Sequence, residues 1–170
     1  MSDIILGDGV FSIGDTATAL TDVALTMGGG RFVVEKDNRI IAADGDYGLV
    51  KGRVRATRVQ PLLTLNGLES IESNMKNFYP GISSSSGTDA VKFTQLIDYS
   101  ATHYKTVAFT GRTIDNRKVY IEITDAINLG NIDWPLVDKE EAIPEITFTA
   151  AYKSTTRTTV PFSITFGTPT

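Results

Sequence analysis

Apolar side chains recur at every second position along most of this chain, which is the pattern of β-strands with one buried face. In residues 119–124, valine and isoleucine alternate with tyrosine, glutamate and threonine. Similar runs cover roughly residues 10–13, 31–42, 50–65, 90–98, 105–113, 117–125, 143–152 and 159–166. So many short strands predict a mainly β fold, either a β-sandwich or a barrel-like pair of antiparallel sheets.

One segment follows the helical period instead. Its apolar residues are spaced three, four and three positions apart, which places them on one stripe of a helix. The stripe consists of Leu68, Ile71, Met75 and Phe78. Asn66 is a candidate N-cap, Glu69 stands where a capping box needs it, and Pro80-Gly81 would end the helix. The pattern predicts one α-helix over residues 67–79, flanking the sheets.

Glycine-rich and polar stretches separate these elements. The three glycines at 28–30 indicate a flexible connection, so that residues 1–30 could form a flexible N-terminal arm. Residues 43–49 predict an exposed hairpin tip, and residues 82–88 a flexible loop. The length predicts a single domain over residues 1–170.

Two pairs of polar residues predict local breaks in the strand pattern. Asp37-Asn38 interrupts an otherwise continuous strand and indicates a β-bulge. Asp115-Asn116 separates two alternating runs and indicates a tight hairpin.

Composition narrows the function classes. The chain has no cysteine, and this excludes disulfide frameworks, thiolate catalysis and cysteine-based zinc sites. Its net charge is −4. The net charge also argues against a nucleic-acid-binding protein. The first residues lack the basic region of a secretory signal, and no apolar run has the length of a membrane span, so we expect no membrane partner.

Charge is unevenly distributed. A regular basic row, Lys51, Arg53, Arg55 and Arg58, is predicted to lie on one face of a strand. Residues 119–145 hold seven acidic groups against one basic group, Lys139. The row could be a solvated face, a nucleic-acid contact, or an ionic contact with the acidic segment of another copy. For the last interpretation, opposite patches on copies that bind head to tail would set their register.

Under the last interpretation, the interface residues come from three regions of the chain. The hairpin tip would contact a neighbouring subunit, because assembly would order its mobile residues. The predicted interface residues are Lys51, Arg53, Arg55 and Arg58 from the basic row, Asp44, Asp46 and Tyr47 from the tip, and Glu122, Asp138, Glu140, Glu141 and Glu145 from the acidic segment.

Catalytic chemistry finds little support. His103 is the only histidine and lies between polar residues at a predicted turn, with no nucleophile elbow in the chain. Asp44-Gly45-Asp46 lacks the further ligands of a calcium loop. Adjacent carboxylates such as Glu140-Glu141 are typical of a solvated loop. We therefore expect no enzyme activity, no metal and no cofactor.

Several runs, in the same order, resemble the major tail tube proteins of long-tailed (siphophage-type) bacteriophages and related prophages. They are ILGDGVFSIG, ADGDYGLVKGRVR, NFYPG, YIEITDAINLGNIDWPLVDKEEAIPEITFTAAY and VPFSITF. The resemblance implies a β-sandwich with one flanking helix, and hexameric rings whose inner sheets join into a barrel and which stack into a tube. It implies a virion-tail location after assembly in the host bacterial cytoplasm. The implied partners are other copies of the chain, the tape measure protein, tail-end proteins, and DNA as transient cargo.

Two alternatives stay open at this point. The inner tube of a contractile injection system, such as that of a myophage or tailocin, shares the implied fold and would need a sheath-binding outer surface. A carbohydrate-binding β-sandwich belongs to a different class and would need aromatic side chains exposed over a groove. Trp134 and several tyrosines are present, but they are scattered along the sequence.

Overall fold

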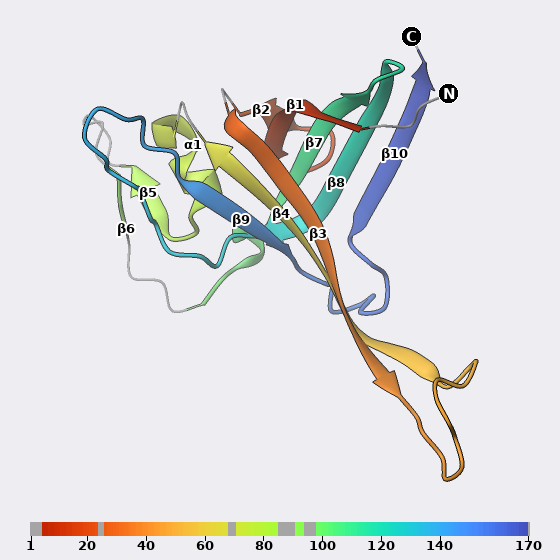
Figure 1. The fold of residues 1–170 in the computed structure, drawn as a ribbon. Coiled ribbons are helices and arrows are strands. Elements are labelled where there is room, and N and C mark those ends of the chain that lie inside the picture. Colours follow the sequence, from red (N-terminus) through yellow and green to blue (C-terminus); the bar gives the residue numbers. More distant parts are fainter. Residues whose placement is uncertain (1–4, 24–25, 68–70, 85–90, 94–97, 170) are drawn as a thin grey trace.

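The computed structural model describes residues 5–23, 26–67, 71–84, 91–93 and 98–169, and antiparallel strands dominate them (Figure 1). The strands are β1 (Ile5–Gly14), β2 (Leu20–Asp22), β3 (Thr26–Ile40), β4 (Val54–Gly67), β5 (Ile82–Ser84), β6 (Val91–Phe93), β7 (Lys105–Thr113), β8 (Arg117–Ile127), β9 (Glu145–Ala150) and β10 (Phe162–Pro169). The helices are α1 (Ile71–Phe78) and the single 3₁₀ turn Ala101–His103. The prediction of a mainly β fold with one flanking helix is confirmed.

Within the described residues, eight strands form one sheet in the order β2-β1-β7-β8-β9-β4-β3, with β10 also paired to β8. The sheet forks along β8. Its first part, Val119–Ile123, pairs with β10, whereas its last residues, Ala126 and Ile127, pair with β9. The two layers predicted from the sequence are therefore two halves of one hydrogen-bonded sheet.

Asp125 lies at the fork. The pairing of β7 with β8 skips from Val107↔Ile123 to Lys105↔Ala126, which leaves an extra residue in β8. Asp125 has a φ of 53°, a left-handed conformation that aspartate tolerates better than most residues. A bulge of this kind bends the strand and increases its twist. The bend lets β8 leave β10 and continue alongside β9, so the sheet folds over itself.

The core fills the space between the two halves of the folded sheet. Leu63 on β4, Phe148 on β9 and Ile123 on β8 are at most 2% exposed, so the inward faces of both halves of the sheet meet there. The buried cluster comprises Phe11, Ile13, Val23, Leu63, Leu65, Met75, Phe78, Tyr79, Val107, Ile123, Ala126, Ile146, Phe148 and Ala150. The alternation seen in the sequence therefore marks the buried face correctly on β8 and β9, whereas Ile164 and Phe166 on β10 are 44% and 47% exposed.

Helix α1 covers one end of this core. Met75 and Phe78 are 6% and 0% exposed, and the Phe78 ring packs edge-on against Phe148 with centroids 6.3 Å apart. The predicted burial of the stripe is confirmed for these two residues. Leu68 and the side chain of Ile71 lie outside what the structure describes.

The predicted cap of this helix is wrong. β4 continues through Gly67, and Asn66 pairs with Glu145 of β9. Asn66 therefore belongs to a strand and the described helix begins only at Ile71, while Glu69 lies outside the described residues. The tertiary pairing with β9 extends the strand through residues whose local pattern favours a cap.

Residues 5–14, 20–22 and 26–30 belong to strands of the sheet, which corrects the prediction of a flexible arm over residues 1–30 for the described part, while residues 1–4 and 24–25 lie outside the described chain. β1 pairs with β7 from Ile5 to Gly14. The glycines at 28–30 lie within β3 and do not form a hinge. A Cβ on Gly30 would lie 2.3 Å from the Phe11 ring, so glycine is needed there because another strand's side chain packs onto the backbone.

Two further loop predictions have different outcomes. The tight hairpin at residues 115–116 is confirmed: the Asn116 N–H donates to the Thr113 carbonyl, and Asn116 has a φ of 58°. The flexible loop predicted at 82–88 is wrong in part, because residues 82–84 form β5, paired with β6. Residues 85–88 lie outside the described chain.

Candidate assembly surfaces

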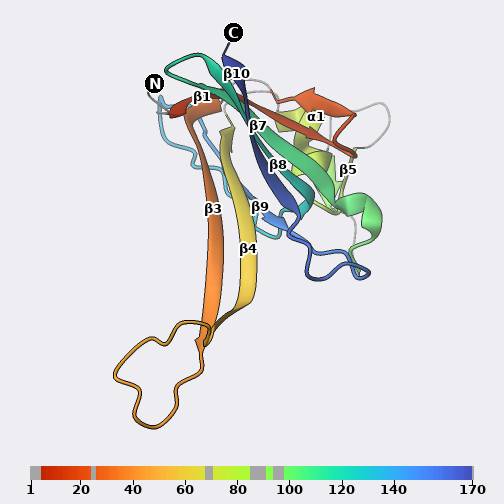
Figure 2. The same cartoon turned by 90° about the vertical axis from the view of Figure 1, so that its right-hand side faces the viewer.

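The longest feature of the molecule is a two-stranded hairpin that leaves the body. β4 pairs with β9 only from Leu62 to Asn66, whereas its pairing with β3 continues to Val54. Residues 35–58, here called the arm, therefore extend beyond the rest of the sheet and carry a loop at their far end (Figures 1 and 2). Every arm residue is exposed except Asp46, Val50 and Arg53, which are partly exposed.

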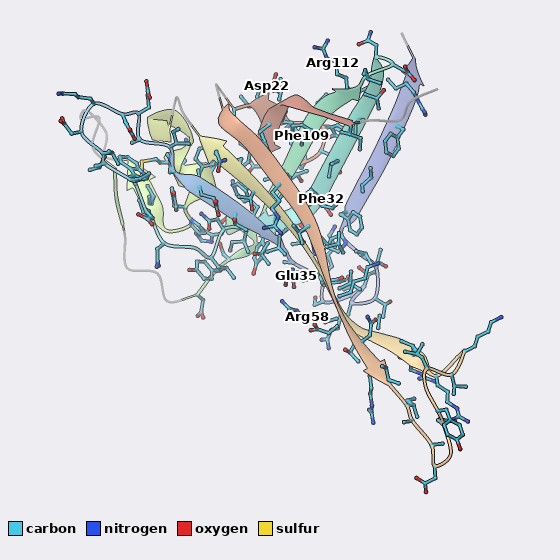
Figure 3. All side chains as sticks on the ribbon, viewed as in Figure 1. Asp22, Phe32, Glu35, Arg58, Phe109 and Arg112 are labelled. Atoms are coloured by element: carbon cyan, nitrogen blue, oxygen red, sulfur yellow. The ribbon has the colours of Figure 1, made fainter. Side chains whose placement is uncertain are left out.

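A bulge and weak ion pairs mark the base of the arm. Pairing skips from Asp37↔Arg58 to Asn38↔Ala56, so Thr57 is the extra residue, and its hydroxyl donates to the Asp37 carbonyl at 3.1 Å. Arg58 lies 3.6 Å from the Asp37 carboxylate and 3.8 Å from that of Glu35; Figure 3 shows Glu35 and Arg58 where the hairpin leaves the body. The predicted interruption near Asp37 is thus confirmed, with the extra residue on β4.

The tip loop, residues 41–53, is organised by Asp46. Its carboxylate accepts the Ala43 N–H at 2.8 Å and lies 2.6 Å from the Arg53 guanidinium. Gly45, with a φ of 89°, supplies the left-handed conformation of the turn. The prediction of an exposed hairpin tip at 43–49 is confirmed, and Tyr47 at its end is fully exposed.

The predicted basic row is not one strand face. Lys51 and Arg53 belong to the tip loop, and β4 begins only at Val54. Asp46 holds Arg53 within the same chain. The turn chemistry of the Gly-Asp loop outweighs the alternating pattern over residues 50–53, which lack a core to pack against.

Arg55 belongs to a pair that the sequence did not reveal. It lies directly opposite Arg39 on β3. Like charges in such cross-strand pairs destabilise a sheet. Neither arginine forms an ion pair with a carboxylate in the described part of the chain. The hairpin register would have exposed this pairing, but sequence alone does not fix the register.

Apolar side chains accompany these charges on the arm. Ile40 is 55% exposed and Leu49 is 69% exposed, far from any described core contact. The exposed apolar residues of the arm are Ile40, Ile41, Tyr47, Leu49 and Val54. Grouped exposure of this kind marks contact surfaces more often than isolated apolar residues do.

The acidic candidates divide into two groups. Glu122 accepts the Tyr120 hydroxyl at 2.7 Å within β8, and Glu145 begins β9 opposite Asn66. The remaining three, Asp138, Glu140 and Glu141, lie exposed in the loop of residues 128–144, here called the acidic loop. The structure therefore brings only this last group together on one segment.

The acidic loop also exposes apolar side chains, which sequence reasoning overlooked. Leu136 is 81% exposed, and Leu129 and Val137 are 60% and 55% exposed. Trp134 is 41% exposed. The sequence shows these apolar residues among carboxylates, but only the structure shows that Leu129, Leu136 and Val137 are left largely uncovered.

Two clefts flank the segment that joins β9 to β10. The larger has a volume of about 800 Å³ and opens at the base of the arm, between β4 and residues 152–160. The smaller, of about 300 Å³, contains Asp125 and Lys153, whose carboxylate and ammonium groups are 3.6 Å apart.

Other candidate chemistry is local. His103 Nδ1 lies 3.0 Å from both the Ser100 backbone nitrogen and the Ser100 hydroxyl oxygen, and so caps the 3₁₀ turn. No group of three or more potential metal ligands occurs among the described residues. In that same part of the chain, no helix is both long and apolar enough to span a membrane.

No protein-family model matches the chain, and a search of curated proteins finds no significant match. The likeness to tail tube proteins therefore rests on the sequence runs quoted above.

Proposed function

We propose that this chain is a structural subunit that assembles with copies of itself into the tail tube of a long-tailed bacteriophage. In this proposal hexameric rings stack into a tube that surrounds the tape measure protein, meets tail-end proteins at its ends and conducts DNA during infection. The chain would be assembled in the host cytoplasm and function in the virion tail without catalysis or cofactor.

The observation that carries the proposal is the arm. A hairpin that leaves its body and exposes Ile40, Tyr47 and Leu49 gains no burial within its own chain. Ordering its residues costs conformational entropy that the isolated subunit does not recover. Docking the arm onto a neighbouring copy would bury these apolar groups and supply that stabilisation.

The charges on the arm support a neighbour of opposite sign. Arg39 and Arg55 face one another and form no ion pair within the described part of the chain, while four acidic groups and one lysine occupy the acidic loop. A single exposed ion pair contributes only about 0–1 kcal/mol. Repetition of such pairs around a ring would add to stability and would steer association.

The carbohydrate-binding alternative gains no structural support. The exposed aromatic residues of the described chain lie on four separate elements: Tyr47 on the arm tip, Tyr99 beside the 3₁₀ turn, Trp134 in the acidic loop and Phe166 on β10. They therefore form no shared platform for a sugar ring. Failure of the purified protein to be retained on polysaccharide columns would be consistent with this conclusion, whereas specific retention would revive the alternative.

Negative-stain electron microscopy of the purified protein tests the proposal directly. Rings or tubes are expected, and a protein that stays monomeric at all concentrations would contradict self-assembly. Growth should slow in 1 M salt, where the Debye length falls to about 3 Å. Binding to a sheath protein would favour the inner tube of a contractile system over the siphophage tube.

Charge reversal then tests the ionic contact of the arm. Arg39→Glu with Arg55→Glu should leave a folded subunit that does not form tubes, and reversal of acidic-loop carboxylates should partly restore assembly. Reversal of Arg39 and Arg55 is a more specific test of the contact between subunits than reversal of Arg53, because Asp46 pairs with Arg53 in the tip turn of the same chain. Lys76→Glu, at an exposed lysine on α1, is the matched control.

Hydrogen exchange tests the role of the tip. The amides of residues 43–49 should exchange rapidly in isolated subunits and slowly in tubes. Equal exchange in both states would refute a contact made by the tip.

A further inference from the structure

The large cleft at the base of the arm has defined walls. The Tyr152 hydroxyl donates to the Val59 carbonyl at 2.6 Å, and the Gln60 side-chain amide donates to the Ala150 carbonyl at 2.6 Å. These two hydrogen bonds tie the segment after β9 to β4. The cleft is therefore built by contacts within the subunit and does not need a partner to hold it open.

The lining of this cleft combines positive charge with apolar surface. Arg58 stands on the β4 side and Arg157 on the opposite side, and Val59 and Val160 contribute apolar surface. Arg58 also forms the long, exposed ion pairs with Asp37 and Glu35 at the base of the arm, so Arg157 is the arginine of the cleft that is open to a new carboxylate. No acidic residue is present among the described residues that line it. The Arg157 Nε donates to the Ser154 carbonyl at 3.2 Å, and among the described residues its guanidinium forms no ion pair with a carboxylate.

The acidic loop has the complementary chemistry. Leu136 and Val137 project into solvent immediately before Asp138, Glu140 and Glu141. An apolar anchor next to carboxylates fits a cleft in which apolar surface lies between two arginines. Arginine suits such a contact because its planar guanidinium can bind a carboxylate through two parallel hydrogen bonds.

The two surfaces lie at opposite ends of β9 within one subunit. The acidic loop precedes Glu145 and the cleft follows Ala150, so the strand separates them by about 20 Å at roughly 3.3 Å per residue. Figure 1 shows the connection from β8 to β9 on the far side of the body from the base of the arm. The acidic loop of one copy can therefore reach the cleft of another copy more readily than the cleft of its own chain. Because the two surfaces differ, such a contact joins subunits head to tail.

We propose that the cleft at the base of the arm binds the acidic loop of a second copy, with Leu136 and Val137 in the cleft and the carboxylates at Arg58 and Arg157. The proposal rests on self-assembly as the function of the chain and identifies the two surfaces that meet. It adds Arg157 and Leu136 to the interface, neither of which belongs to the basic row or the acidic groups predicted from the sequence.

Site-directed cross-linking tests the contact without requiring tubes. The chain has no cysteine, so Thr158→Cys in the cleft and Leu136→Cys in the loop can be introduced singly and the two proteins mixed. A disulfide-linked heterodimer should accumulate about tenfold faster than with Lys76→Cys in place of Leu136→Cys, since docking raises the local thiol concentration. Addition of Arg157→Glu to the cleft protein should reduce this rate to that of the control.

Assembly measurements provide the second readout. Arg157→Glu should raise the critical concentration for assembly by about tenfold or more, because like charges would then face one another. Leu136→Ser should act in the same direction while leaving thermal stability unchanged, since that side chain is already 81% exposed. Arg157→Glu combined with Glu140→Arg should recover part of the loss.

The outcomes separate the two proposals. Normal assembly of Arg157→Glu, with cross-linking at the control rate, would overturn the docking contact and leave the tube function standing. A wild-type protein that never assembles would overturn the tube function. In that case the cross-linking experiment alone decides, and a rate that does not depend on Arg157 would overturn the docking contact as well.

Discussion

The aromatic rings of Phe32 and Phe162 pack against one another with centroids 5.5 Å apart and an interplanar angle of 53°. Phe32 belongs to β3 and Phe162 to β10, two strands that share no backbone pairing. This contact joins the two halves of the forked sheet close to where the hairpin leaves the body. Tilted aromatic pairs contribute about 0.5–1.5 kcal/mol beyond their buried area.

A double-mutant cycle should detect this contact. Phe32→Leu and Phe162→Leu should each destabilise the subunit, and their coupling should be about 0.5–1.5 kcal/mol in chemical denaturation. Phe32→Leu combined with Tyr47→Leu at the arm tip is the matched control, and these two changes should be additive. Additivity of the Phe32 and Phe162 changes would show that the rings do not support one another.

Phe78→Ala should destabilise the subunit by about 3–5 kcal/mol, the usual cost of removing a buried phenylalanine. The Phe78 side chain is fully buried against Phe148, so its loss leaves a cavity between α1 and the sheet. Thermal and urea unfolding measure the effect. Leu49→Ala, at a side chain that is 69% exposed, should change stability by less than about 0.5 kcal/mol. An unchanged melting temperature for Phe78→Ala would contradict the packing of the helix.

Gly30→Ala should destabilise the fold by about 1–3 kcal/mol, the usual cost of overpacking. The added methyl group would lie 2.3 Å from the Phe11 ring and 2.6 Å from the Thr64 carbonyl oxygen, so strand or ring must move. Gly48→Ala is the matched control, because nothing lies within 4 Å of a methyl group there. Equal melting temperatures for the two variants would show that the strands do not approach as closely as described.

Alkaline unfolding should depend on Tyr120. Burial, with a hydrogen bond to Glu122, raises the pKa of Tyr120 from 10.0 to about 12. The folded state therefore retains a proton that the unfolded state loses, and the free energy of unfolding should fall as pH rises from about 10 to about 12. Tyr120→Phe should flatten this slope in urea unfolding at about pH 9 to 11.5. The exposed residue Tyr99 provides the control Tyr99→Phe, and an unchanged slope in Tyr120→Phe would refute the assignment.

Several features of this protein could be predicted from the sequence because they depend on local chemistry. A side-chain period of two identifies a strand wherever one face is buried, as it does for β9, whose alternating burial over Glu145–Ala150 lies within the predicted residues 143–152. Asn116 tolerates a positive φ, so its hairpin follows from residue type. The apolar stripe of α1 likewise identified two residues that the structure buries, Met75 and Phe78.

The candidate site could be predicted only in part. The exposed tip and the acidic group at Asp138, Glu140 and Glu141 follow from composition, because charged and glycine-rich segments stay in solvent. The basic row failed because alternation was extended into the tip loop, where Asp46 and Gly45 form a turn.

What the tertiary structure decided is which residues far apart in the sequence lie together. The register of β3 against β4 places Arg39 opposite Arg55, and the bulge at Asp125 turns β8 from β10 towards β9. The hydrogen bond from Tyr152 to Val59 spans 93 residues and helps to build the cleft that both Arg58 and Arg157 line. Local patterns carry no information on such contacts, because strand register and sheet folding are selected by the burial of the whole core, whereas turns and periodicity are selected residue by residue.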